Sequence, residues 1–294
     1  MQQRLTIGMP VYNNATTLRR AVESLLAQSF GDFRLLISDD GSKDDTVEIC
    51  HEYGARDSRI AVVQQRQNLN YGNFRYLVHA ATTPLFMFAA GDDYWHHDYV
   101  ARMISELDAH PEAVCAVSRV AFLQDGQMVE YSEGTASLVG SRIDNLVRYL
   151  DSPNDNSRMY GVFRTHVAQR AFPRKNFHAF DWAFSAGTLL AGTHLEVPEV
   201  LMWRDRTHPD RYTEYVRRDA DSTIGRIFPM LPLTVDLLTR LRVPPSYAVL
   251  RQLYWLNIDF HLNYLRRYHP RAARFSEGAI NGLARFSRRI QALL

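Results

Sequence analysis

Two pairs of neighbouring aspartates follow short apolar segments of this 294-residue chain. Asp39-Asp40 follows the apolar run 33–38, and Asp92-Asp93 comes shortly after the run 85–89. Clustered carboxylates repel one another and bind a hard divalent cation through oxygen, and such a cation in turn binds phosphate. Each pair by itself is also typical of a turn or a helix cap, so that alternative stays open.

Other phosphate chemistry is disfavoured by what the sequence lacks. It contains no GxxxxGK[ST] loop, and no GxGxxG follows the first apolar run. The chain is therefore not expected to be a P-loop ATPase or a Rossmann dehydrogenase.

The aspartates close predicted strands in an alternating pattern. Strands are predicted at 4–11, 33–38, 60–64 and 85–89, and helices at 16–28, from 42 onward, at 71–81 and at 98–110. Strands that alternate with helices imply right-handed crossovers and a mostly parallel sheet. Such open sheets bind ligands at the carboxyl ends of their strands, so we expect both aspartate pairs at one crevice.

The alternation loosens after residue 110. An antiparallel hairpin is predicted for 114–122 and 128–131, with its turn at Asp125-Gly126. Helices are expected at 141–150 and 181–191, a strand at 195–203, and helices punctuated by prolines from 223 onward.

The composition of the chain is ordinary, but its charge is distributed unevenly. The sequence is 46% hydrophobic and 22% charged, which is ordinary globular composition, and its two cysteines form no CxxC motif. No apolar stretch has the length of a membrane span, so a cytoplasmic location is expected. From Arg226 onward, eleven arginines stand against three acidic residues, a net charge of +8, which leaves −6 for residues 1–225.

Several segments, in order and spacing, resemble family 2 glycosyltransferases with the GT-A fold over about residues 4 to 210. They are Met9–Asn13, Ser38–Ser42, Asn68–Phe74, Ala90–Trp95, Tyr160–Arg164, Phe180–Trp182, Val197–Leu201 and Arg206–His208. The resemblance implies a Rossmann-like, mostly parallel central sheet flanked by helices. It also implies inverting transfer of a sugar from a nucleotide diphosphate donor, with a divalent metal, Mn²⁺ or Mg²⁺.

By this resemblance, five residues bind the nucleotide part of the donor. Pro10 and Tyr12 would line the base pocket, where an aromatic face stacks on a nucleobase. Asp39 would accept a hydrogen bond from the base N–H. Asn73 and Arg75 would face the diphosphate. The alternatives are an aromatic that covers the strand end for Tyr12, a turn-forming aspartate for Asp39 and a solvated helical arginine for Arg75.

The metal motif departs from the commonest pattern of the family. Members often have Asp-x-Asp-Asp, and Ala90 occupies the first of these positions. The resemblance then makes Asp93 the metal ligand, and Asp92 the partner of the ribose hydroxyls or of a metal-bound water. His208 would complete the metal or diphosphate contact, the alternative being a surface histidine. His96 and His97 are not expected to bind zinc, because adjacent imidazoles point apart on a regular backbone.

Asp181 is the candidate base. Displacement at the anomeric carbon needs an acceptor hydroxyl activated by a carboxylate, while metal neutralises the leaving diphosphate. One carboxylate therefore suffices, unlike in glycoside hydrolysis. Many members have Glu-Asp at this place, but Phe180 precedes Asp181 here. The alternative for Asp181 is a helix N-cap.

These expectations define two domains. Residues 1–222 would form the GT-A domain, with 1–95 binding the nucleotide and 96–222 the sugar and acceptor; residues 223–294 would form a basic helical extension.

The expected ligands follow from the same resemblance. A UDP- or dTDP-sugar donor and a saccharide or lipid-linked acceptor are expected, and no nucleic acid is expected. The alternatives are a nucleotidyltransferase, which would need a glycine-rich basic loop after the first strand, and a non-catalytic saccharide-binding protein.

The basic extension has two interpretations. Its arginines alternate with leucine, phenylalanine and tyrosine, a composition suited to peripheral contact with the inner membrane face. Its many apolar residues, Trp255 among them, favour packing on the catalytic domain or on a second copy in a homo-oligomer.

Overall fold

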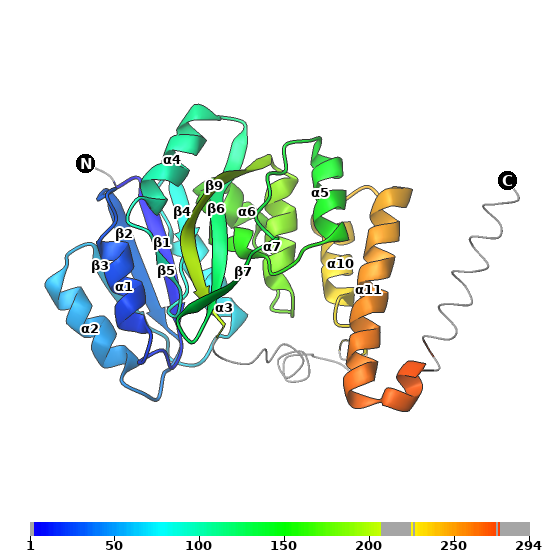
Figure 1. The fold of residues 1–294 in the computed structure, drawn as a ribbon, viewed down its shortest axis with the longest axis horizontal. Helices are drawn as coiled ribbons and strands as arrows, with labels where there is room; N and C mark the ends of the chain where they lie inside the picture. Colours follow the sequence, from blue (N-terminus) through cyan, green and yellow to red (C-terminus); the bar gives the residue numbers. More distant parts are fainter. Residues whose placement is uncertain (1–2, 207–224, 226, 275, 277–294) are drawn as a thin grey trace, which may run out of the picture. The chain divides into compact units, whose positions relative to one another are not determined.

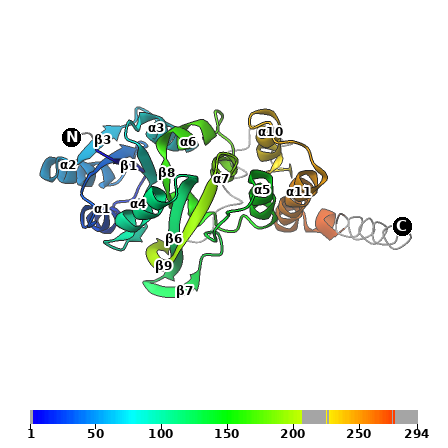
Figure 2. The ribbon, with the colours of Figure 1, turned by 90° about the horizontal axis from the view of Figure 1, so that it is seen from above.

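The computed structural model describes residues 3–206, 225, 227–274 and 276. The chain divides into two compact units, Met1–Asp210 and Arg211–Leu294, and each is described by itself. In the first unit, helices cover both faces of a central sheet (Figures 1 and 2).

The first unit alternates strands and helices up to residue 109 and has a mixed pattern after it. Its strands are β1 (Leu5–Val11), β2 (Phe33–Asp39), β3 (Ile60–Gln64), β4 (Leu85–Phe88), β5 (Tyr94–Trp95), β6 (Ala113–Gln124), β7 (Gln127–Tyr131), β8 (Val162–Arg164) and β9 (Thr193–Asp205). Its α-helices are α1 (Leu18–Leu26), α2 (Thr46–Arg56), α3 (Tyr71–Ala80), α4 (Tyr99–Ala109), α5 (Arg142–Asp151), α6 (Thr165–Ala171) and α7 (Phe180–Leu189), and a 3₁₀ helix η1 covers Ser157–Tyr160.

The sheet has the order β3-β2-β1-β4-β8-β6-β9-β5, with β7 paired to β6. The strands β3, β2, β1 and β4 are parallel, as the alternating pattern predicts. The second half is mixed, because β8 runs antiparallel to both β4 and β6 while β9 runs parallel to β6. The β6–β7 hairpin is confirmed. The elements β5, β8 and α6 were not predicted, since segments of two to seven residues carry too little periodicity.

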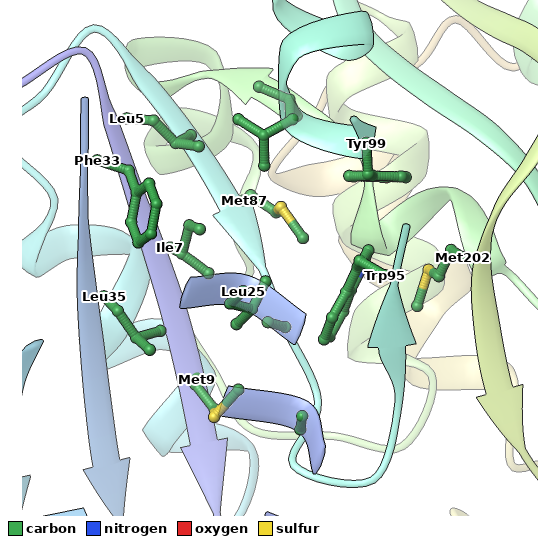
Figure 3. Packing of buried hydrophobic residues seen from close by; sticks show 14 of the residues in the cluster. Leu5, Ile7, Met9, Leu25, Phe33, Leu35, Met87, Trp95, Tyr99 and Met202 are labelled. Atoms are coloured by element: carbon green, nitrogen blue, oxygen red, sulfur yellow. The ribbon is translucent and has the colours of Figure 1, made fainter. Parts of the chain in front are cut away.

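Two hydrophobic clusters fill the space between sheet and helices. On one face, alternate residues of β1 (Leu5, Ile7 and Met9) pack with Leu25 of α1 and with Tyr99 of α4 (Figure 3). On the other face, side chains of β2 and β4 pack against α3, α6 and α7. The period of two along β4 therefore places Leu85 and Met87 in the first cluster and Phe86 and Phe88 in the second.

One glycine permits this packing. A Cβ on Gly8, in the middle of β1, would lie 3.0 Å from the ring of Phe86 on the neighbouring strand. Its absence lets Phe86 meet Phe88 edge-on, with ring centroids 4.6 Å apart. The sheet can therefore carry large aromatics on this face.

The second unit contains α10 (Leu231–Thr239) and α11 (Tyr247–Tyr268). Ser246 caps α11 by accepting a hydrogen bond from the backbone N–H of Val249, and Asn257 donates from Nδ2 to Thr234 Oγ1 of α10 at 2.8 Å. None of the helices among the described residues combines the length and apolarity that a membrane crossing requires.

Candidate active site

Five of the predicted residues, Pro10, Tyr12, Asp39, Asp92 and Asp93, lie at or shortly after the carboxyl ends of β1, β2 and β4. Because β1 pairs in parallel with β2 on one side and β4 on the other, the segments that follow all three strands leave the same edge of the sheet. A Cβ on Gly91 would lie 3.0 Å from the side chain of Asn14, so the turn after β4 touches the loop after β1. Thr17 Oγ1 strengthens this contact by donating to the Gly91 carbonyl at 2.8 Å.

Asp39 is fully buried at the end of β2. Its Oδ2 accepts hydrogen bonds from the backbone N–H groups of Gly41 at 3.0 Å and Ser42 at 3.2 Å. Gly41 has a φ of +82°, which the turn requires and which glycine adopts without strain. These are the contacts of a turn-forming aspartate, and a hydrogen bond from a base N–H to Asp39 stays a prediction.

Asp40 holds a second loop against the same strand end. Its two carboxylate oxygens accept from the backbone N–H groups of Leu69 at 2.7 Å and Asn70 at 2.9 Å. Burial raises the pKa of Asp40, and these two hydrogen bonds oppose the shift. The Asp39-Asp40 pair thus shapes the two loops beside the crevice.

Tyr12 lies at the end of β1 with 48% of its surface exposed. Its backbone N–H donates to Asn14 Oδ1 at 2.9 Å, which fixes the backbone there. Pro10, two residues earlier, is partly exposed and pairs in the sheet with Ser38. An exposed aromatic face at this edge of the sheet is available for stacking.

Asn73 and Arg75, which were predicted to face the diphosphate, both have hydrogen-bond partners within the protein. Asn73 is buried, accepts from Ser38 Oγ at 2.6 Å and donates to the Ser38 carbonyl at 2.9 Å, so it joins α3 to β2. Arg75 donates from Nη1 to the Arg174 carbonyl at 2.7 Å and to Asn176 Oδ1 at 3.0 Å. Asn73 thus contacts β2 and Arg75 contacts the loop before α7, and the role of both residues toward the diphosphate stays a prediction.

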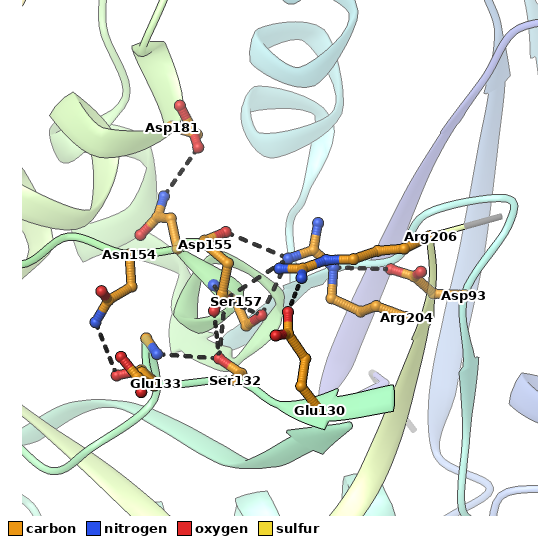
Figure 4. Close-up of polar contacts among 12 residues, drawn as sticks. Asp93, Glu130, Ser132, Glu133, Asn154, Asp155, Ser157, Asp181, Arg204 and Arg206 are labelled. Carbon is orange, nitrogen blue, oxygen red and sulfur yellow. Dashed lines mark hydrogen bonds and ion pairs between the residues drawn. The ribbon is translucent and has the colours of Figure 1, made fainter. Parts of the chain in front are cut away.

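Asp93 is 3% exposed and is the most perturbed carboxylate of the site. Its Oδ1 accepts from the backbone N–H of Asp205 at 3.2 Å, whereas its Oδ2 has no hydrogen-bond partner and lies 3.6 Å from Arg204 Nε (Figure 4). Burial raises its pKa to about 7, with Arg204 opposing the shift and the neighbouring Asp92 adding to it. Asp92 is partly exposed beside it.

The unpartnered oxygen of Asp93 fits a divalent cation. A buried carboxylate oxygen without a partner is costly, and a bound cation would remove that cost. Asp92 lies next to it in the chain, and Ala90 contributes no ligand. His208, the third candidate ligand, lies outside the described residues.

His96 and His97 do not point apart, so the geometric reason against a shared zinc site at these two residues is wrong. Their ring centroids are 4.2 Å apart, and with Asp98 they bring three ligand atoms within 4.8 Å of one another. His97 Nε2 lies 3.0 Å from Asp98 Oδ2, and Ser29 Oγ donates to Asp98 Oδ1 at 2.7 Å. These contacts account for the cluster without a cation. The His96–Asp98 cluster lies near the C-terminal end of α1, whereas Tyr12 lies near the N-terminal end of that helix.

Asp181 occupies the first turn of α7, and Ala179, with a φ of +64°, is the N-cap. The N-cap alternative for Asp181 is therefore wrong. Asp181 is partly exposed, and its Oδ2 accepts a hydrogen bond from Asn156 Nδ2 at 3.1 Å. Burial raises its pKa, and the bond from Asn156 is the largest opposing effect. Phe180 instead packs against Tyr71 at 4.7 Å between ring centroids, which explains an aromatic residue at this position.

Arg204 joins the candidate carboxylates Asp93 and Asp181 into one network, which the sequence did not reveal. It faces Asp93, donates from Nη1 to Ser157 Oγ at 3.0 Å and lies 3.8 Å from Asp155 Oδ1 (Figure 4). The next residue, Asn156, binds Asp181. The available signals were an arginine directly after the apolar run 200–203 and the turn-forming run 154–157.

Comparison with known proteins places this geometry in a class. Residues 1–349 of TarS from S. aureus, solved in complex with UDP-GlcNAc, share the fold with a TM-score of 0.65 and 16% identity over 90% of this chain and 73% of that one. The mannosyltransferase PcManGT from Pyrobaculum calidifontis, solved with GDP-Man and Mn²⁺, gives a TM-score of 0.50 and 16% identity over 96% and 81%. The fold is that of the GT-A glycosyltransferases.

The family model for glycosyl transferase family 2 matches residues 6–175, and the chain belongs to that family. It is 27% identical over 108 residues to glycosyltransferase GlyA of Streptococcus pneumoniae, which covers 36% of this chain and 15% of that protein. It is 29% identical over 104 residues to the uncharacterized glycosyltransferase EpsJ of Bacillus subtilis, which covers 35% and 30%. The matched stretch thus spans less than a third of each of these relatives.

Proposed function

We propose that the protein transfers a sugar, with inversion, from a nucleotide diphosphate donor to a hydroxyl of a saccharide or lipid-linked acceptor in the synthesis of a polysaccharide. The observation that carries the proposal is the network from Asp93 through Arg204 and the 154–157 loop to Asp181. It holds a buried carboxylate, one oxygen of which accepts no hydrogen bond, and a partly exposed carboxylate in one arrangement within the fold of this family.

The donor half of the reaction uses the edge formed by β1, β2 and β4. The exposed ring of Tyr12 stacks on the base beside Pro10, and the turns held by Asp39 and Asp40 form the adjoining wall. A UDP- or dTDP-sugar is the proposed donor. The bound UDP-GlcNAc of TarS supports a nucleotide sugar, while the GDP-Man of PcManGT shows that base and sugar vary on this fold.

A divalent cation, Mn²⁺ or Mg²⁺, would be held by Asp93 and Asp92, with His208 as a further ligand. When bound, it supplies positive charge to the departing diphosphate. Arg204 already places a positive charge 3.6 Å from Asp93 Oδ2. The buried Asp93 carboxylate therefore has a positively charged neighbour even when no cation is bound. The Mn²⁺ found with PcManGT supports this assignment.

Asp181 serves as the base for the acceptor. Its carboxylate takes the proton of the attacking hydroxyl, and the oxygen then displaces the diphosphate from the opposite side of the anomeric carbon, which inverts the configuration. A base in this role must be ionised and close to the hydroxyl. Its position at the start of α7 leaves part of the carboxylate exposed while the helix N-terminus favours its charge.

The test is a panel of nucleotide sugars with Mn²⁺, in which release of nucleoside diphosphate and transfer to a saccharide acceptor are measured. Asp181→Asn removes the base without changing the size of the side chain. We expect it to bind donor normally and to lose roughly 10²- to 10⁴-fold in transfer rate. Turnover within a few fold of the unmodified enzyme would remove Asp181 from this role.

A further inference from the structure

Asn156 is buried and bonded to Asp181. It lies between α5 and η1 with 1% exposure and with a φ of +51° and a ψ of +32°. Asparagine is among the few residues other than glycine that adopt this left-handed conformation readily. The backbone therefore directs the Asn156 side chain toward α7.

The amide of Asn156 makes three hydrogen bonds. Its Nδ2 donates to Asp181 Oδ2 at 3.1 Å, and its Oδ1 accepts from Tyr149 Oη and from Ser185 Oγ, both at 2.9 Å. Asp181 and Ser185 are four residues apart and lie on the same face of α7. One amide therefore spans successive turns of the helix that carries the base.

These contacts leave the amide a single favourable orientation. Both lone pairs of Oδ1 are taken by hydroxyl donors, so Nδ2 must face the carboxylate. A reversed amide would place its carbonyl oxygen against Asp181 and leave the hydroxyls of Tyr149 and Ser185 facing N–H groups. Because Tyr149 and Ser185 are themselves 2% exposed or less, water cannot substitute for either contact.

We propose that Asn156 is the positioning residue for Asp181, orienting its carboxylate and stabilising its negative charge. This inference rests on the proposed function, in which Asp181 is the base. Asn156 itself touches no substrate and acts through the carboxylate alone.

The charged and titratable groups around Asp181 make this bond important. Tyr149 of α5 and Tyr160 of η1 interact with it from one side, and Arg204 of β9 favours its charge. Burial raises the pKa of Asp181, and the Asn156 hydrogen bond is the largest effect that lowers it. Loss of that bond therefore raises the pKa, and the acidic limb of the rate profile moves to higher pH.

Asn156→Gly is the variant that tests this, because glycine keeps the left-handed backbone and removes only the amide. Asn154→Gly is its matched control: Asn154 also has a φ of +51°, is exposed, and donates to the Glu133 carbonyl rather than to Asp181. Ser185→Ala removes one of the two donors that orient the Asn156 amide and leaves the loop backbone unchanged.

We expect Asn156→Gly to shift the acidic limb of kcat upward by about one pH unit, with roughly a tenfold loss below the limb and recovery above it. The donor KM should stay within about twofold. Ser185→Ala should shift the limb by less in the same direction, and Asn154→Gly should leave it in place. An unmoved limb, or an equal loss at every pH, would overturn the inference. If Asn156→Gly does not fold, Ser185→Ala decides alone.

A second readout needs no turnover. The carboxyl carbon of Asp181, assigned by its absence in Asp181→Asn, can be titrated by NMR in protein labelled at aspartate. A higher pKa in Asn156→Gly supports the inference even if no nucleotide sugar is consumed, in which case only the proposed function fails. An unchanged titration in a protein that does transfer sugar overturns the role of Asn156 and leaves the proposed function intact.

Discussion

Two carboxylates of the site have different chemistry because their neighbours differ. Asp39 gives its Oδ2 to two backbone N–H groups, whereas Asp93 keeps an Oδ2 without a hydrogen-bond partner in a buried position. A carboxylate that is satisfied by the backbone shapes a turn, and one that is not satisfied is ready for a cation. Both residues are aspartates, so the difference between their contacts comes from their surroundings.

This difference predicts a contrast in metal dependence. Calorimetry with UDP, with and without Mn²⁺, should show that Asp93→Ala lowers the affinity about tenfold or more in Mn²⁺ and abolishes the gain from the metal. Asp39→Ala should weaken binding by a similar factor with and without metal, because the 40–42 turn loosens. The exposed carboxylate of Asp108, replaced by alanine, is the control.

Asp39→Asn separates the two interpretations of that residue. The amide retains an oxygen for the Gly41 and Ser42 N–H groups, so we expect affinity close to that of the unmodified protein. If Asp39 accepts the base N–H directly, the asparagine variant should lose as much affinity as the alanine variant. Equal affinity in every variant, Asp93→Ala included, would mean that the donor binds elsewhere.

At the scale of the elements, η1 and β8 connect the loop that contacts Asp181 to the sheet. Asp155, just before η1, accepts from Ser132 Oγ at 2.8 Å and from the backbone N–H of Ser157 at 2.9 Å. Gly161, between η1 and β8, approaches β6 closely, since a Cβ there would lie 2.7 Å from the Ala116 carbonyl oxygen and from Cys115 Sγ. The loop that holds Asp181 is thus anchored on a strand inside the sheet.

Gly161→Ala should therefore be costly. β6 is paired on both sides and cannot move away from the new methyl group, so we expect a loss of about 2 to 3 kcal/mol in the free energy of unfolding. Urea denaturation measures it, with a lower midpoint and an unchanged slope. Gly31→Ala, where a Cβ meets nothing within 4 Å, should change stability by no more than about 0.5 kcal/mol. Equal midpoints for the two variants would contradict this account of the η1–β8 junction.

At the scale of the whole molecule, charge is distributed unevenly along the chain. Residues 1–225 carry a net charge of −6 and the remainder +8. The second unit also exposes apolar side chains, with Tyr247 at 78%, Val235 at 50% and Tyr254 at 49%. An arginine-rich surface with exposed apolar residues suits a protein partner or an anionic surface.

We expect the extension to bind protein rather than lipid. In sedimentation with vesicles of anionic phospholipid, the full chain should remain in the supernatant at low salt, and its oligomeric state should decrease when residues 272–294 are removed. Co-sedimentation at low salt that is lost at high salt would support peripheral membrane contact instead, because salt screens surface charge. An oligomeric state that does not change on truncation would exclude 272–294 from the interface.

The sequence alone determined much of the first unit. Local periodicity and turn residues predict β1 to β4 with their helices, because each of these signals lies within about ten neighbouring residues. Parallel pairing then places the ends of β2 and β4 at one edge of the sheet without further information. Motif order along the chain indicated the family, and the family model confirms it.

Only the tertiary structure decided which side chains meet. Asn73 bonds to Ser38 of β2, and Asp93 meets Arg204 from a strand 111 positions away in the chain. Asn156 reaches Asp181 across 25 residues through a loop whose conformation local pattern does not predict. Periodicity within one segment carries no information about its neighbours in space, so these contacts depend on the pairing of β6 with β9 and on the packing of α7. The Asn156–Asp181 hydrogen bond therefore belongs to the fold, while the carboxylate that it holds was already visible in the chain.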